Sequence, residues 1–182
     1  MSQQNHQLTT KNRELTTLLR SSTRTGIGYD VHRFELGRPL ILGGVSIPHP
    51  DGMGLAGHSD ADVLCHAIAD AILGAAGKRD IGYYFPNSDP SIRGISSLKI
   101  LEKAVQLLAE DQMSLVNIDA TLIAEQPMIN PHIDEMKKKI AHALHLDVSC
   151  IGIKATTNEG LGFLGRSEGM AAMAIATIEK KE

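Results

Sequence analysis

The segment from residue 170 to residue 178 constrains the fold more than any other part of the sequence. Its side chains alternate as in a β-strand, and both alternating sets are apolar. One set is Met170, Ala172, Ala174 and Ala176, and the other is Met173 and Ile175. A strand with two apolar faces needs cover on both sides. We therefore expect it in a sheet that has helices on one face and an oligomer contact on the other.

The same alternation predicts further strands. It occurs at 25–32, 116–122 and 151–156, and in the first of these Asp30 and His32 point the same way. Gly43-Gly44 stands between two short apolar runs, 40–42 and 45–47, which is typical of a hairpin with a two-residue turn.

Apolar residues at helical spacing predict three helices. The first begins at the capping-box spacing of Ser59 and Asp62 and ends at the glycines at 74 and 77. The second passes through 98–108, and the third starts at Asn130-Pro131 and continues to 144. Residues 78–95 read as a long loop, which we expect to be functional. Strands and helices interspersed in this way predict an α+β fold, a mixed β-sheet with helices packed on one face.

Length and composition indicate one globular domain. We expect a flexible N-terminal extension at residues 1–23, rich in Thr, Ser, Gln and Asn, and one folded domain at 24–182. The formal net charge of −3 gives no support for a nucleic-acid surface, and no apolar run approaches the length of a membrane span. Cys65 and Cys150 are expected to be reduced core residues, and the expected compartment is the cytoplasm, with plastid import as an alternative.

Asp30, His32 and His66 form the clearest candidate metal site. A strand pair two residues apart and one helical histidine can converge on a single ion, and two imidazoles with one carboxylate leave a fourth position open, as in catalytic zinc sites. Asp62 or Asp70, four residues on either side of His66, is a candidate acceptor for its second ring N–H. The alternative is a chance grouping, because the chain has eight histidines.

Two further segments are candidate phosphate contacts. His58-Ser59 lies at the expected helix N-terminus, which favours an anion, although Ser59 alternatively only caps the helix. The hydroxyl-rich turn at 154–162, with Arg166 beyond it, could hold phosphate oxygens and a second hard cation, or could be an ordinary loop. The chain has no nucleophile elbow, HExxH helix or dinucleotide fingerprint, so the nucleophile could belong to the substrate.

Several ordered motifs together resemble the 2-C-methyl-D-erythritol 2,4-cyclodiphosphate synthase family. They are Gly28-Tyr29-Asp30-Val31-His32, the Leu-Gly-Gly run at 42–44, the Ala-Gly-His-Ser-Asp-Ala-Asp run at 56–62, Asp80-Ile81-Gly82 with Phe85-Pro86-Asn87-Ser88-Asp89, and the run at 154–159 with Gly162-Phe163 and Gly165-Arg166. The resemblance covers about residues 24–179.

The resemblance implies a ferredoxin-like α+β subunit that assembles as a homotrimer, with each active site between neighbours. The implied substrate is 4-diphosphocytidyl-2-C-methyl-D-erythritol 2-phosphate, whose own 2-phosphate attacks its β-phosphorus. CMP leaves, and the 2,4-cyclodiphosphate of the non-mevalonate isoprenoid pathway remains.

The resemblance also assigns roles to residues. Asp30, His32 and His66 match zinc ligands, and Glu159 matches the ligand of a second divalent ion, Mg²⁺ or Mn²⁺. His58 and Thr157 match positions that stabilise the transition state. The implied contacts to the methylerythritol phosphate portion are Ser59, Asp80, Ile81, Gly82, Phe85, Pro86, Asn87, Ser88 and Asp89.

The implied cytidine pocket is Ala124, Glu125, Gln126, Pro127, Met128, Ile129 and Asn130, with Thr156, Thr157 and the polar turn residue Asn158. Met128 stands where the family commonly has a lysine. Phe163 and Arg166 match residues near the trimer axis, where the family has a cavity able to hold an isoprenoid diphosphate.

Two other functions use the same residues. A zinc phosphohydrolase would generate hydroxide at the Asp30, His32 and His66 site and release a linear product. A non-catalytic trimeric module would bind metal or a cytidine nucleotide without turnover.

Overall fold

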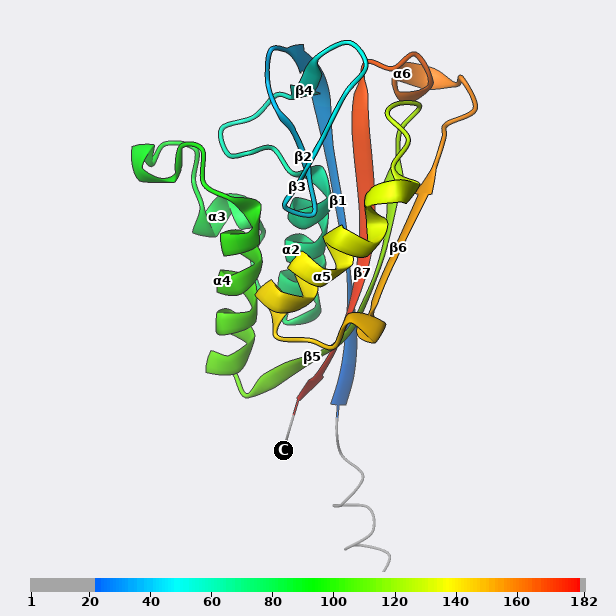
Figure 1. The fold of residues 1–182 in the computed structure, drawn as a ribbon. Helices are drawn as coiled ribbons and strands as arrows, with labels where there is room; N and C mark the ends of the chain where they lie inside the picture. The colour runs from blue at the N-terminus through cyan, green and yellow to red at the C-terminus, as the bar shows by residue number, and fades with distance from the viewer. Residues whose placement is uncertain (1–21, 181–182) are drawn as a thin grey trace, which may run out of the picture.

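The computed structural model describes residues 22–180, and its centre is a five-stranded sheet (Figure 1). The strands lie in the order β4-β1-β7-β5-β6. Their bounds are Met53–Leu55 for β4, Ser22–Leu36 for β1, Gly169–Lys180 for β7, Met113–Ile123 for β5 and Ile151–Thr156 for β6. Only β5 and β6 pair in parallel, so the sheet is mixed, as the sequence predicts.

Three long helices cover one side of this sheet (Figure 1). They are α2 (Val63–Ala75), α4 (Ser97–Glu110) and α5 (Ile133–Leu144). The short elements are the hairpin strands β2 (Leu40–Leu42) and β3 (Val45–Ile47), the helices α3 (Ile81–Tyr84) and α6 (Gly162–Gly165), and 3₁₀ turns at Pro90–Ile92, Asn130–His132 and Val148–Cys150. The predicted hairpin at Gly43-Gly44 and the predicted long helices and strands are confirmed.

Helix α2 lies directly on β1 because small residues meet at the contact. A Cβ at Gly28 would lie inside the van der Waals radius of the Ala67 carbonyl, and one at Gly26 would collide with the Ala71 carbonyl. Glycine on the strand therefore lets the helix backbone approach to a distance that no other residue allows. This contact fixes the height and rotation of α2 over the strand that carries Asp30.

The start of α2 corrects one prediction. The residue that caps the helix is Asp62, whose Oδ1 accepts a hydrogen bond from Cys65 N at 3.1 Å and whose Oδ2 accepts one from Gly44 N at 2.8 Å. Ser59 lies three residues earlier in a turn, where its Oγ accepts a hydrogen bond from Ala61 N. His58 and Ser59 are thus not at a helix N-terminus.

Within residues 22–180, no helix covers the other side of the sheet. Ile27, Tyr29 and Val31 of β1 are 40–65% exposed there, and Met173 and Ile175 of β7 are 42% and 45% exposed. Ile27 pairs with Ile175, and Tyr29 pairs with Met173. These five residues form the open-face patch, and Met173 and Ile175 are its members that the sequence predicted to need cover. The helical side of β7, from Met170 to Ile178, is buried in the core.

Two further expectations are corrected. Residues 78–95 contain α3 and a 3₁₀ turn and are not a loop throughout. The ferredoxin-like connectivity is wrong, because that pattern has one helix after the first strand and a hairpin between the second and third. Here α2 and α4 both precede β5, α5 connects β5 to the parallel β6, and β7 returns between β1 and β5.

The cysteines and the chain ends complete the comparison with the sequence. Cys65 is buried and Cys150 is half-buried at the end of a 3₁₀ turn, so only the first is a core residue, and both are free thiols. The expected extension at residues 1–23 lies outside the described residues except for Ser22 and Thr23, which begin β1. Among residues 22–180, no helix combines the length and apolar character that a bilayer crossing requires.

We predict that Gly28→Ala destabilises the protein by about 3 kcal/mol or more, because the added methyl group must push α2 away from β1. Gly74→Ala is the matched control. Its Cβ would lie 3.8 Å from its nearest neighbour, the Ile27 carbonyl, and alanine in a helix stabilises by about 0.5–1 kcal/mol over glycine. Urea unfolding followed by circular dichroism measures both, and equal effects at the two positions would contradict the account.

Candidate functional site

Asp30, His32 and His66 converge at the contact between β1 and α2. His32 Nε2 and His66 Nδ1 each lie 2.9 Å from Asp30 Oδ2, and the two ring nitrogens are 3.3 Å apart. They form the one group of at least three metal-ligating side chains found within residues 22–180. The sequence-predicted cluster is therefore assembled, with β1 supplying two side chains of one face and the first turn of α2 supplying the third.

The protonation of His32 suits a cation. Its Nδ1 lies 2.6 Å from the carbonyl oxygen of Ala56, which can only accept a hydrogen bond, so Nδ1 carries the proton. The Nε2 lone pair of neutral His32 then points at Asp30 Oδ2 and His66 Nδ1. Three electron-pair donors facing one another need a proton or a metal ion between them, and two imidazoles with one carboxylate are ligands that Zn²⁺ accepts.

The Asp30 carboxylate and the two histidine rings shift the pKa values of Asp30 and His32 in the direction that favours their charged forms. Burial by itself would raise the pKa of Asp30, but hydrogen bonds and positive charge from His32 and His66 outweigh it and hold that pKa well below its usual value. Burial would lower the pKa of His32, yet the Asp30 carboxylate raises it above the ordinary value. A negative carboxylate is thus present at neutral pH to attract a cation.

The second ring nitrogen of His66 meets two hydroxyl groups. Nε2 lies 3.0 Å from Ser97 Oγ and 3.2 Å from Ser59 Oγ. Ser97, which is fully buried at the start of α4, donates its hydroxyl proton to Asp60, and its backbone N–H donates to the same carboxylate at 2.8 Å. With that proton committed, Ser97 Oγ accepts the Nε2 proton of His66 and leaves Nδ1 free for a metal ion.

This arrangement corrects the proposed partners of His66. Asp62 caps α2, and Asp70 accepts a hydrogen bond from Ile81 N, so neither contacts the His66 ring. Sequence reasoning missed Asp60 and Ser97 as supporting residues. Ser97 reaches His66 through the packing of α4 against α2, and Asp60 acts on His66 through Ser97, so no local period of the sequence could show either role.

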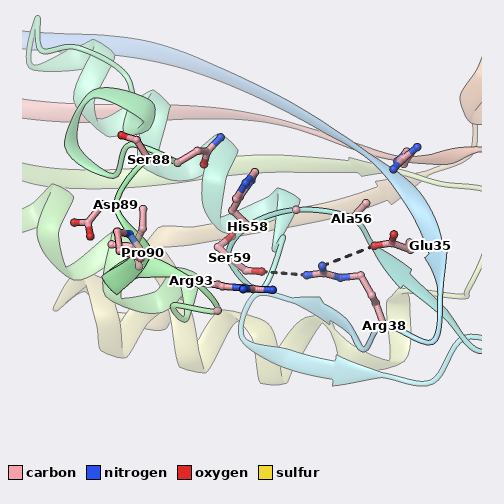
Figure 2. Close-up of a pocket in the computed structure, with 14 residues that line it drawn as sticks. Glu35, Arg38, Ala56, His58, Ser59, Ser88, Asp89, Pro90 and Arg93 are labelled. Carbon is pink, nitrogen blue, oxygen red and sulfur yellow. Dashed lines mark hydrogen bonds and ion pairs between the residues drawn. The ribbon is translucent and has the colours of Figure 1, made fainter.

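A cavity of about 240 Å³ opens beside the cluster. The residues that line it include eight of those predicted to contact the substrate: Asp30, His32, His58, Ser59, Ile81, Gly82, Phe85 and Asn87. A larger cavity of about 680 Å³ adds Ser88 and Asp89 and is shown in Figure 2. Asp80 caps α3 by accepting a hydrogen bond from Tyr83 N, and neither it nor Pro86 lines either cavity.

The predicted cytidine residues line a separate cavity of about 460 Å³. These are Ala124, Glu125, Pro127, Met128, Ile129, Asn130, Thr156 and Thr157, without Gln126. No residue of this cavity lines either of the other two. The predicted cytidine residues and the other residues predicted to bind the substrate therefore line cavities that share no residue within one chain.

Glu159 contacts Thr157, one of the predicted cytidine residues. Its Oε1 accepts a hydrogen bond from Thr157 Oγ1 at 2.6 Å, and it is not part of the Asp30 cluster. The same turn is anchored by Glu125, whose Oε1 accepts a hydrogen bond from Asn158 N. Phe163 lies in α6 and is 44% exposed, and Arg166 just beyond α6 pairs with Glu168, so neither joins a described cavity.

The fold and the cluster define an α+β subunit with a candidate metal site, and comparison with known proteins gives its family. The model of the YgbB family matches residues 23–179. A 2-C-methyl-D-erythritol 2,4-cyclodiphosphate synthase from Akkermansia muciniphila is 60% identical over 155 residues, which cover 85% of this chain and 90% of the relative. The chain therefore belongs to the YgbB family, and the resemblance seen in its motifs is confirmed.

Solved structures agree with this assignment. The bifunctional IspDF from Campylobacter jejuni matches with a TM-score of 0.84 at 42% identity, over 89% of this chain and 43% of the bifunctional chain. The CDP complex of IspF from Plasmodium falciparum matches with a TM-score of 0.76 at 32% identity, over 88% of this chain and 98% of that protein. At these identities the solved structures support membership of the family as well as the fold.

We predict that Ser97→Ala lowers the affinity for a divalent ion by about tenfold or more, because His66 loses the acceptor that fixes its tautomer. Ser114→Ala, at an exposed hydroxyl on β5, is the control and should bind as the unchanged protein does. Competition of Zn²⁺ with a chromophoric chelator measures both. Equal affinity of Ser97→Ala and the unchanged protein would show that Ser97 does not support the site.

Proposed function

We propose that the protein converts 4-diphosphocytidyl-2-C-methyl-D-erythritol 2-phosphate into 2-C-methyl-D-erythritol 2,4-cyclodiphosphate and CMP. The observation that carries this proposal is the convergence of Asp30, His32 and His66 beside a cavity lined by His58 and Ser59. It occurs in a chain that is 60% identical to a relative named for the formation of this product.

The reaction needs no nucleophile from the protein. An oxygen of the 2-phosphate forms a bond to the β-phosphorus, and the bond from that phosphorus to the oxygen it shares with the α-phosphorus breaks. CMP leaves with the electron pair of that bond. The task of the protein is to hold the two reacting groups in line and to stabilise the negative charge on the phosphoryl oxygens.

Asp30, His32 and His66 would hold Zn²⁺, and Glu159 would hold a second divalent ion, Mg²⁺ or Mn²⁺. When bound, such ions polarise phosphate oxygens and neutralise their charge as Lewis acids. His32 and His66 are oriented for this by Ala56 and Ser97, and Asp30 supplies the negative charge.

The remaining residues position the substrate. His58 and Thr157 would stabilise the transition state by donating hydrogen bonds to phosphoryl oxygens. Ser59 and the residues from 80 to 89 would hold the methylerythritol phosphate portion. The cavity that contains Met128 and Thr156 would hold the cytidine, consistent with the CDP named in the complex of the Plasmodium falciparum relative.

A homotrimer would join the two separate parts of the site. One chain has the metal cluster in one cavity and the predicted cytidine residues in another, and a neighbouring copy would bring its own cytidine residues to each cluster. The open-face patch offers the apolar surface for that contact. Phe163 and Arg166 would then lie near the axis and could hold an isoprenoid diphosphate.

The direct test is incubation of the purified protein with the proposed substrate and Mg²⁺, followed by phosphorus NMR. We expect CMP and the cyclic diphosphate to appear together, and a chelator to stop both. His66→Ala should reduce turnover by about a hundredfold or more, because a ligand is lost, while His142→Ala on the exposed face of α5 should not.

The same assay distinguishes a phosphohydrolase and a non-catalytic nucleotide-binding module from the proposed synthase. CMP with a linear phosphate product would indicate a phosphohydrolase. Binding of CDP by a folded, zinc-loaded protein without turnover would indicate a nucleotide-binding module and would contradict the proposal.

We further predict that Ile27→Glu combined with Ile175→Glu yields a folded monomer with no turnover. These neighbours lie across β1 and β7, and two carboxylates there would lose their hydration if the patch were covered. Sedimentation velocity measures the oligomeric state, with Lys99→Glu on α4 as the control for the change in charge. A trimeric double variant with full activity would place the interface elsewhere.

A further inference from the structure

The cavity in Figure 2 contains basic side chains that the proposed reaction leaves without a role. Arg33, Arg38 and Arg93 line it together with the acidic residues Glu35 and Asp89, which gives the lining one net positive charge in a chain of net charge −3. The cavity shares His58 and Ser59 with the cavity beside the metal cluster. An anionic group bound here would therefore lie next to that cluster.

The guanidinium group of Arg38 has one nitrogen that donates a hydrogen bond and another that has no partner. Its Nη2 donates a hydrogen bond to the Ser59 carbonyl at 3.2 Å, while its Nε is shielded from solvent and has no hydrogen-bond partner. Its ion pair with Glu35 is 3.8 Å long, which is beyond hydrogen-bond distance, and it is partly exposed to water. A buried N–H donor without a partner favours an acceptor from a ligand.

Arg93 is held at the cavity by its neighbours in the chain. Gly94 N donates to the His58 carbonyl at 2.9 Å, and Asp60 N donates to the Ile95 carbonyl at 3.2 Å, so the segment that carries Arg93 runs along the turn of His58. Within residues 22–180, the Arg93 guanidinium forms no hydrogen bond or ion pair. Figure 2 shows Arg38 and Arg93 extending toward each other below Ser59.

The acidic residues do not neutralise this pair of arginines. Asp89 Oδ1 accepts a hydrogen bond from Ser91 N at 2.9 Å and caps the 3₁₀ turn, and Glu35 reaches Arg38 only at its 3.8 Å separation. Two guanidinium groups that face one cavity repel each other unless an anion lies between them. A phosphate monoester suits this position, because its oxygens match the forked N–H donors of arginine.

We propose that Arg38 and Arg93 bind the 2-phosphate of the substrate before it attacks the β-phosphorus. The identity of the ligand rests on the proposed function, whereas the anion site rests on the cavity alone. Ser59 connects the two regions: its carbonyl accepts from Arg38, and its hydroxyl lies 3.2 Å from His66 Nε2. The arginines would hold the nucleophile, and the metal cluster would face the diphosphate.

Arg93→Gln is the clean test, because this exposed side chain makes no contact that folding needs. We expect KM for the substrate to rise about tenfold or more, the effect of one lost charge-assisted hydrogen bond, with kcat within about threefold. The inhibition constant of 4-diphosphocytidyl-2-C-methyl-D-erythritol, which lacks the 2-phosphate, should not change. Arg93→Lys should restore part of the loss, and Arg24→Gln at the distant end of β1 should behave as the unchanged protein.

Titration of each protein with inorganic phosphate by calorimetry gives a readout that does not require turnover. Weaker phosphate binding by Arg93→Gln than by Arg24→Gln supports the anion site even if no cyclic product forms, in which case the proposed function fails alone. An unchanged KM with equal phosphate binding overturns the site. An equal rise in KM and in the inhibition constant of the analogue without the phosphate also overturns it.

Discussion

The backbone contact between β1 and α2 is the constraint on which the rest of the structure depends. Gly26 and Gly28 remove the side chains that would separate strand and helix, and Ala67 and Ala71 present small side chains at the same level. The next helix-facing residues along β1 are Asp30 and His32, and His66 precedes Ala67. The approach that packs the core therefore also brings three ligand atoms within hydrogen-bond distance of one another.

The turn at residues 57–62 connects this contact to the rest of the site. Asp62 ties the start of α2 to the hairpin through Gly44, Ser59 contacts both His66 and Arg38, and Asp60 receives both hydrogen bonds of Ser97. Burial raises the pKa of Asp62, and the nearby negative charge of Asp60 adds to this rise. The hydrogen bonds from Cys65 N and Gly44 N offset part of the rise in pKa. A short segment thus holds the metal cluster, the hairpin and the start of α4 in one arrangement.

Local patterns were sufficient to predict much of this. Alternation gave the strands and placed Asp30 and His32 on one face, and helical spacing placed His66 on α2, so the cluster was within reach of sequence reasoning. The capping residue was wrong because Ser59 and Asp62 both suit a cap and only the path of the turn distinguishes them. The partners of His66 were wrong because Ser97 reaches it across helix packing and not along one helix face.

The strand connectivity and the full extent of the open-face patch could not be predicted from the sequence. The strand order depends on where β7 inserts, and local periodicity contains no information about which strands become neighbours. The β7 part of the patch was predicted from the two apolar faces of 170–178, whereas the contribution of Ile27, Tyr29 and Val31 follows from the pairing of β1 with β7. That the predicted cytidine residues and the Asp30 cluster lie in different cavities is visible only in three dimensions.

The most direct test of this account is a crystal structure of the zinc-loaded protein with anomalous diffraction measured at the zinc absorption edge. The account predicts one strong peak at about 2.0–2.2 Å from His32 Nε2, His66 Nδ1 and an Asp30 carboxylate oxygen, the distances typical of zinc ligands. A zinc peak at another site, with these three side chains hydrogen-bonded only to one another, would contradict the claim that the β1–α2 contact builds a metal centre.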